Sequence, residues 1–111
     1  MSSSERVRYM RLIVFFDLPV ETAPQRRAHA RFRRFLLKNG YLMMQESVYS
    51  KLAVDGRMTG ALIARLQENK PPEGLVQVLQ VTEKQYSGIT NIVGGGASRE
   101  EVGSTEGLIV L

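Results

Sequence analysis

The spacing of apolar residues in the first part of the chain predicts a buried strand followed by an amphipathic helix. From Val7 to Phe16 the pattern begins as an alternation and becomes continuously apolar at Leu12, which is typical of a strand covered on at least one face. Thr22 is a favourable N-cap and Gly40 a favourable stop, so we expect a helix that runs to Asn39. Its apolar residues recur at helical spacing on one stripe: Ala28, Phe32, Phe35 and Leu36.

The middle of the chain carries signals for two short strands, a second helix and a longer strand. The short strands are expected over residues 41–45 and 47–52, with a turn between them. Asp55 is a candidate N-cap for a helix over residues 56–69, and a Lys-Pro-Pro-Glu-Gly sequence ends that helix. Apolar and polar residues alternate over 75–82, which predicts a half-buried strand. The resulting order, β-α-β-β-α-β, predicts an α+β fold of the ferredoxin-like kind.

The two ends of the chain differ in composition from the middle. Residues 1–6 are polar and Ser-rich and are expected to fray, whereas residues 7–93 are expected to form the ferredoxin-like domain, with a turn and a short extra strand at 89–93. Residues 94–107 have the composition of a flexible Gly-rich linker. An apolar strand is expected at the C-terminus. We expect it to be shielded from water by pairing with a sheet edge, either of this chain or of a partner. Its residues are Leu108, Ile109, Val110 and Leu111.

Overall composition narrows the class of protein. A chain of 111 residues is long enough for one domain with one core. The absence of cysteine excludes disulfides and thiolate metal sites, and it fits a reducing cytoplasm. No apolar run approaches the roughly 20 residues of a membrane span. We therefore expect a cytoplasmic protein without a membrane partner.

Positive charge is concentrated in the first forty residues and indicates a polyanionic partner. Residues 1–40 contain nine Lys/Arg and three Asp/Glu, a balance of +6, whereas residues 41–111 contain six and eight, a balance of −2. Arg27, Arg31, Arg34 and Lys38 repeat along one flank of the first helix, and Arg26 lies on another flank. Arg26 and Arg27 fall in the first turn, where backbone N–H groups also attract anions. The alternative is a solvated helix face. The candidate phosphate-binding residues are Arg26, Arg27, Arg31, Arg34 and Lys38.

Asp17 is the residue with the clearest chemical signal. It is one of only two aspartates, and it follows directly on the apolar run of the first strand, where a charge is costly unless it is paired or coordinated. One reading makes it a Mg²⁺ ligand, but one carboxylate per chain is too few, so a two-fold axis would have to bring two copies around one ion. In the other reading, Asp17 caps the turn into Pro19 or pairs with an arginine.

The remaining polar and aromatic residues give weaker signals. His29 is the single histidine and lies among the arginines of the first helix, where we expect a partly exposed residue rather than an acid–base catalyst. Three tyrosines are expected to pack in the core or at an interface, and two methionines are expected to fill the core. These five residues are Tyr41, Tyr49, Tyr86, Met43 and Met44.

Three stretches taken together resemble a narrower family than the fold alone indicates. The family is that of the small, non-integrase subunit of the CRISPR spacer-acquisition machinery, and the resemblance is to the type II form. It covers about residues 7–93. The stretches are Arg8-Tyr9-Met10-Arg11-Leu-Ile-Val-Phe-Phe-Asp17-Leu-Pro19, Arg34-Phe-Leu-Leu-Lys-Asn-Gly40 and Gln45-x-Ser47-Val48-Tyr49.

This resemblance implies a homodimer of ferredoxin-like protomers, with C-terminal strands that reach the partner. It implies a scaffold between two integrase dimers, with the double-stranded spacer precursor lying across it. It also implies Mg²⁺-dependent cleavage of RNA or DNA, with Asp17 as the metal ligand and catalytic residue.

Three hypotheses therefore stand beside one another. The first is a homodimeric scaffold that binds duplex DNA and docks the CRISPR integrase subunit. The second is a Mg²⁺-dependent endoribonuclease or endodeoxyribonuclease that acts on its own. The third is a ferredoxin-like RNA-binding or regulatory module unrelated to CRISPR.

Overall fold

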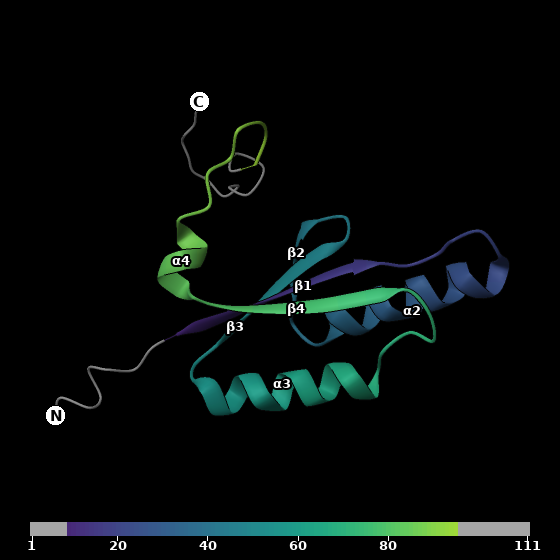
Figure 1. Ribbon diagram of the computed structural model, residues 1–111, viewed down its shortest axis with the longest axis horizontal. Coiled ribbons are helices and arrows are strands. Elements are labelled where there is room, and N and C mark those ends of the chain that lie inside the picture. Colours follow the sequence, from purple (N-terminus) through teal and green to yellow (C-terminus); the bar gives the residue numbers. More distant parts are fainter. Residues whose placement is uncertain (1–8, 96–111) are drawn as a thin grey trace, which may run out of the picture.

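The computed structural model describes residues 9–95 and contains four strands and three helices within them (Figure 1). The expected frayed residues 1–6, most of the linker expected over 94–107 and the expected strand at Leu108–Leu111 lie outside the described residues. The elements in chain order are β1 Met10–Asp17, α2 Ala23–Lys38, β2 Leu42–Gln45, β3 Val48–Ala53, α3 Gly56–Glu68, β4 Leu75–Thr82 and α4 Glu83–Ser87.

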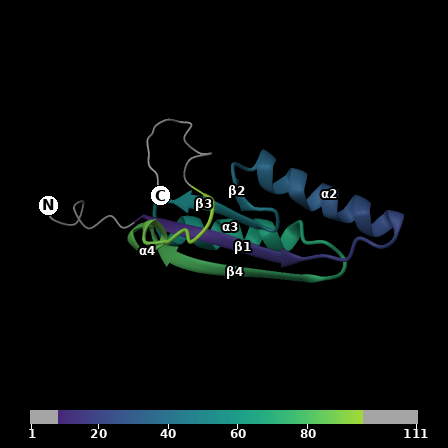
Figure 2. The ribbon, with the colours of Figure 1, turned by 90° about the horizontal axis from the view of Figure 1, so that it is seen from above.

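The four strands form one antiparallel sheet in the order β2-β3-β1-β4, so β1 is central and pairs with both β3 and β4. Side chains of α2 and α3 join those of β1 in one core, which places both helices on the same face of the sheet. Figure 2 shows α2 lying beside the sheet. This arrangement confirms the predicted ferredoxin-like α+β fold, because the strand order and the paired helices are those of a split βαβ.

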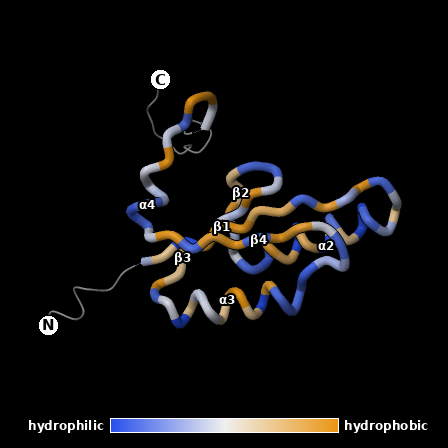
Figure 3. The backbone as a smooth tube through the Cα atoms, in the orientation of Figure 1, coloured by the Kyte–Doolittle hydropathy of each residue, from blue (hydrophilic) through white to orange (hydrophobic). Residues whose placement is uncertain are grey.

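Alternate residues of β1 point to opposite faces of the sheet, and this alternation defines the core. Leu12, Val14 and Phe16 are buried against the helices, together with Phe32 and Leu36 of α2. Hydrophobic positions run along β1 and β4 in Figure 3. Truncating a buried leucine such as Leu12 to alanine would cost about 2–5 kcal/mol, so this layer holds the fold together.

Both predicted helix starts are confirmed by their caps. The Oγ1 atom of Thr22 accepts a hydrogen bond from the Gln25 amide at 3.2 Å, and the Gln25 side chain accepts one from the Thr22 amide at 2.9 Å. The carboxylate of Asp55 accepts a hydrogen bond from the Met58 amide at 3.0 Å. These caps place the start of each helix at the predicted position, since they satisfy amides that the helix itself leaves unpaired.

Three expectations from the pattern are wrong. Residues 89–93 contain no strand, and the short helix α4 instead follows β4 directly. Thr82 caps this helix with Gln85 in the same reciprocal arrangement, so the Thr-x-x-Gln spacing is a local signal for the start of α4.

The two methionines of β2 also differ from the expectation that they fill the core. Met43 is 53% exposed, because β2 is an edge strand with a bulge after this residue. Met44 is only half-buried.

Candidate metal and nucleic-acid sites

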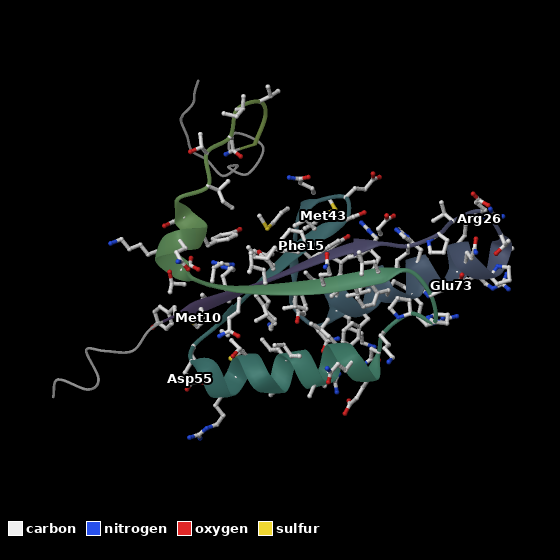
Figure 4. The ribbon with its side chains drawn as sticks, in the orientation of Figure 1. Met10, Phe15, Arg26, Met43, Asp55 and Glu73 are labelled. Carbon is white, nitrogen blue, oxygen red and sulfur yellow. The ribbon has the colours of Figure 1, made fainter. Side chains whose placement is uncertain are left out.

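Asp17 is the last residue of β1 and lies on the face of the sheet that the helices leave open. The alternation along β1 places Phe16 in the core and both Phe15 and Asp17 on the opposite face. Phe15 lies on the side of the sheet away from α3 in Figure 4. We call this side of the sheet, which carries Arg11, Ile13, Phe15 and Asp17 in β1, the open face. The carboxylate of Asp17 is therefore presented to solvent rather than to the core.

The Asp17 side chain makes no hydrogen bond and no ion pair with any of residues 9–95. Neither the arginine pairing nor the capping of the Pro19 turn considered from the sequence is present among these residues. Because the group is exposed, water stabilises its charge in the single chain. The carboxylate is thus available to an external cation or to a second molecule.

A shallow hollow adjoins Asp17 on the open face. The polar residues that line it are Asp17, Ser47 and Gln77. Ser47 is held against the end of β1 because its carbonyl accepts a hydrogen bond from the Phe16 amide at 3.1 Å. The residues that line the hollow are Phe15, Phe16, Asp17, Ser47, Val48, Leu75 and Gln77.

One chain supplies only part of a magnesium site. Within residues 9–95 there is no group of three or more acidic, histidine or cysteine side chains that could hold a metal ion. Mg²⁺ is commonly held by one or two carboxylates, with water and substrate phosphate completing an octahedron. An exposed, unpaired carboxylate in a hollow that Ser47 and Gln77 also line fits half of such a site, provided that a second copy of Asp17 completes it.

The predicted basic row is exposed on the outer side of α2, away from the sheet. Arg27, Arg31, Arg34 and Lys38 all lie on the side opposite the buried residues of the helix. Among residues 9–95 the single ion pair is Arg11 with Glu83, so no described carboxylate neutralises the row. The exposed, unpaired charges fit a polyanion better than a face laced with local ion pairs.

Arg26 has a local structural role as well as an exposed position. Its Nη1 atom donates hydrogen bonds to the carbonyl oxygens of Val20 at 3.2 Å and Glu21 at 3.0 Å. These bonds fix the loop between Asp17 and the Thr22 cap. Figure 4 shows Arg26 near the beginning of α2. Arg26 is one of the predicted phosphate-binding residues, but one nitrogen of its guanidinium already donates hydrogen bonds within this loop.

Asp17 and the basic row are not brought together. The carboxylate lies on the open face, whereas the row faces outward from the helix layer on the other side of the sheet. His29 belongs to neither surface, because its ring packs edge-on against the Phe16 ring, with the ring centroids 5.9 Å apart. The protein therefore has two distinct candidate surfaces rather than one composite site.

The open face also carries large apolar side chains that the sequence reasoning did not single out as a group. Phe15 is 37% exposed and Leu79 is 49% exposed, in an antiparallel sheet where water would otherwise meet polar residues. The strand register places the others on the same face, and several exposed apolar side chains on one sheet face are typical of an interaction surface. Its exposed apolar residues are Phe15, Leu42, Leu52, Leu75 and Leu79.

Helix α4 covers the opposite end of the open face from Asp17. Arg11 donates hydrogen bonds to both carboxylate oxygens of Glu83, at 2.9 and 2.7 Å, and its guanidinium lies 4.2 Å from the ring centroid of Tyr86. The hydroxyl groups of Ser50 and Tyr86 are 3.4 Å apart. The hydrogen bonds from Arg11 lower the pKa of Glu83 below its usual value. The end of the sheet that carries Asp17 stays uncovered by α4.

The fold and these surfaces define a small ferredoxin-like protein with one carboxylate on an open sheet face and a basic helix behind it. A family model described as "CRISPR associated protein Cas2" matches residues 10–89. The chain belongs to this Cas2 family. No helix within residues 9–95 is long and apolar enough to cross a membrane.

Relatives with curated names span most of the chain. A protein of Treponema denticola named CRISPR-associated endoribonuclease Cas2 is 47% identical over 102 residues, which are 92% of this chain and 100% of the relative. A protein of Streptococcus mutans serotype c with the same name is 50% identical over 78 residues, 70% of this chain and 72% of the relative. A solved structure described as "Crystal structure of cas2" has a TM-score of 0.53 at 24% identity, over 91% of this chain and 99% of that one. The solved structure supports the fold.

Proposed function

We propose that the chain is the dimeric Cas2-type scaffold of CRISPR spacer acquisition, that it binds duplex DNA and bridges integrase dimers, and that it has a Mg²⁺-dependent endonuclease centre at Asp17. One observation carries this proposal: an unpaired carboxylate stands at one end of an exposed apolar sheet face. A second copy packed on that face would bury the apolar residues and add a second Asp17 carboxylate. Membership of the Cas2 family replaces the hypothesis of a module unrelated to CRISPR.

The dimer is supported by the chemistry of the open face. Two-fold dimers are the commonest oligomers, and they bury the same patch on both subunits. A dimer built through Phe15, Leu75 and Leu79 would shield side chains that are each more than a third exposed in the single chain. The two-fold axis would have to pass near the Asp17 end of the open face, because only there could the two carboxylates share one ion. Helix α4 covers the other end of this face, which leaves the Asp17 end for the partner.

The C-terminal residues Leu108–Leu111 are proposed to complete the dimer by pairing with the outer edge of β4. This edge is free among the described residues, and β4 has no charged side chain over its eight residues. Long uncharged edge strands readily accept another strand. A variant lacking residues 104–111 should elute later in size-exclusion chromatography and bind the integrase more weakly; unchanged elution and binding would contradict this part of the proposal.

Duplex DNA would lie across the exposed basic row. Arginine and lysine side chains that contact phosphates release counterions and bind without regard to base sequence, as a scaffold for arbitrary spacers requires. Four unpaired basic residues per protomer supply such contacts, and Arg26 would add another near the N-terminus of α2. The four residues of the row are Arg27, Arg31, Arg34 and Lys38. Two protomers would present two rows to one duplex.

At the Asp17 centre, the carboxylates of two protomers would hold Mg²⁺, with Ser47 and Gln77 beside them. When bound, the ion would supply an activated water and offset charge on the scissile phosphate. The two Asp17 carboxylates would hold that centre between the protomers, and the apolar residues of the open face would exclude bulk water from the interface. Cleavage would therefore require the dimer.

The second candidate is an endonuclease that acts without an integrase. The observation that favours it is the set of relatives, several of which carry the name endoribonuclease. It needs the same Asp17 centre, but neither the basic row nor a docked integrase has to contribute.

One set of gels separates the two candidates. Labelled duplex DNA and RNA of equal length are incubated with wild type, Asp17→Asn or the matched control Asp55→Asn, in Mg²⁺ and in EDTA. Asparagine is also a good N-cap, so Asp55→Asn should leave α3 intact. We expect a duplex shift in all three proteins and cleavage that disappears only in Asp17→Asn. Duplex binding without any Asp17-dependent cleavage would support the scaffold and contradict the nuclease centre. RNA cleavage without duplex binding would favour the independent nuclease.

A further inference from the structure

Gly74 lies immediately before β4, opposite the residue that carries the proposed metal centre. Leu75, the next residue, is the register partner of Asp17 at the end of the β1–β4 pair. The backbone of Gly74 has a φ angle of +99°, in the left-handed region that side chains other than glycine rarely adopt. The loop that ends α3 therefore enters β4 through a conformation suited to glycine.

The lack of a side chain at position 74 also lets this loop press on the end of β1. A Cβ atom at Gly74 would lie 2.8 Å from the backbone oxygen of Asp17, 2.7 Å from Cδ2 of Leu18 and 3.1 Å from its Cα. The Leu18 side chain is buried, and the oxygen belongs to the backbone. Any substitution would therefore push β1 and β4 apart at Asp17 rather than displace a flexible side chain.

Among the glycines of the described residues, Gly74 is the one at which a Cβ atom would come within 3.0 Å of a backbone atom; at Gly40 and Gly95 the atoms that close belong to side chains. A Cβ atom at Gly56 or at Gly60 would meet nothing within 4 Å. The residue before Gly74 ties the same loop to α2, because the Glu73 carboxylate accepts a hydrogen bond from the Gln25 side chain at 3.5 Å. Figure 4 shows Glu73 near the part of α2 that carries Arg26. The loop thus touches both the end of β1 and the first turn of the basic helix.

We propose that Gly74 is a positioning residue for the Asp17 metal centre, holding the end of β1 at the place where two copies of the carboxylate can share one ion. The inference rests on the proposed function. Mg²⁺ demands near-ideal octahedral geometry at about 2.0–2.1 Å, so a displacement of a few tenths of an ångström at Asp17 matters for binding. Outer residues that orient a metal ligand typically change affinity 10–100-fold when they are replaced.

The test measures metal binding directly. Full-length ¹⁵N-labelled protein is titrated with Mn²⁺ as a paramagnetic probe, and broadening of the Asp17 and Leu75 amide signals is followed. The proteins are wild type, Gly74→Ala, Gly74→Asn, Asp17→Asn and the control Gly60→Ala. Gly74→Asn is included because asparagine tolerates a positive φ better than alanine does. Duplex affinity in EDTA is measured on the same samples.

For the two Gly74 variants we expect a native-like amide spectrum, unchanged duplex affinity, and a rise of about tenfold in the Mn²⁺ concentration for half-maximal broadening. Gly60→Ala should match wild type. Equal Mn²⁺ dependence in wild type and both folded Gly74 variants would overturn the inference, and so would failure of both variants to fold, which would make Gly74 a folding residue. Wild type that shows no Asp17-dependent broadening would instead overturn the proposed metal centre.

Discussion

The guanidinium of Arg11 in β1 binds both carboxylate oxygens of Glu83 in α4, at 2.9 and 2.7 Å. The two residues are far apart in the sequence, and their contact fixes α4 over one end of the open face. Arg11 is largely buried by this arrangement, with 12% of its side chain exposed. The pairing therefore decides which part of the open face remains for a partner.

This ion pair should make stability depend on acid pH. The hydrogen bonds from Arg11 lower the pKa of Glu83 in the folded state below its usual 4.5. The stabilisation is therefore present above pH 4.5 and is lost as pH falls through the lower folded value. At pH 7 we expect Glu83→Gln to lower the free energy of unfolding by about 1 kcal/mol, and this difference from wild type should shrink below pH 4.5. Urea unfolding of both proteins, with the exposed Glu46→Gln as control, measures it; a difference independent of pH would contradict the assignment.

Tyr41 should produce a dependence on alkaline pH. Burial raises the pKa of its hydroxyl to about 12, so the folded state loses stability as pH rises from 10 toward 12, where only the unfolded tyrosine ionises. The hydroxyl has no hydrogen-bond partner among the described residues. We expect Tyr41→Phe to be as stable as wild type at pH 7, or up to about 1 kcal/mol more stable, and to unfold at higher urea concentration than wild type at pH 11.5. Parallel unfolding curves for the two proteins across this range would show that the phenol is accessible.

A charge on the open face should separate the protomers without unfolding them. Leu79 is 49% exposed in the single chain, so Leu79→Glu leaves the core intact but places a carboxylate inside the proposed dimer. Light scattering should give a monomer for this variant and a dimer for wild type. Leu37→Glu is the matched control, because Leu37 is 42% exposed on α2, away from the open face. A dimeric Leu79→Glu variant would place the interface elsewhere.

The Asp17 carboxylates should repel one another when no cation is present. In EDTA we expect the dimer of Asp17→Asn to dissociate at several-fold lower concentration than that of wild type, because like charges held close in the interface are unfavourable. Mg²⁺ should tighten the wild-type dimer and leave Asp17→Asn unchanged. Sedimentation velocity measures both effects, with Asp55→Asn as control. An equal response of wild type and Asp17→Asn to Mg²⁺ would show that the two carboxylates do not share an ion.

The basic row should control the salt dependence of DNA binding. Each phosphate contact contributes roughly −0.9 to the slope of log K against log salt, so Arg31→Gln with Arg34→Gln should reduce the slope by about 2 per protomer. Binding should weaken alike for unrelated duplex sequences. Arg57→Gln at the start of α3 is the control, since Arg57 is exposed but lies outside the row. An unchanged slope in the double variant would remove α2 from the DNA path.

Local patterns in the sequence are enough to locate most of the regular elements and the core. Caps at Thr22 and Asp55, the apolar run ending at Phe16 and the alternation over β4 are local signals, and each lies at the position that the pattern predicts. Local rules suffice there because a cap or a buried stripe depends on neighbours a few residues away. The same rule applies at Thr82 and Gln85, which cap α4, but the apolar residues after this helix have the composition of a strand and mask its signal.

The placement of the candidate functional residues depends on contacts between segments that are distant in the chain. The face of the sheet on which Asp17 lies depends on the register of β1 with β3 and β4, and a shift of one residue would reverse it. The separation of Asp17 from the basic row follows from the packing of α2 on the other face, although the two segments are adjacent in the chain. The contacts of Arg11 with Glu83 and of Gly74 with Asp17 join residues distant in sequence, and no local pattern specifies them.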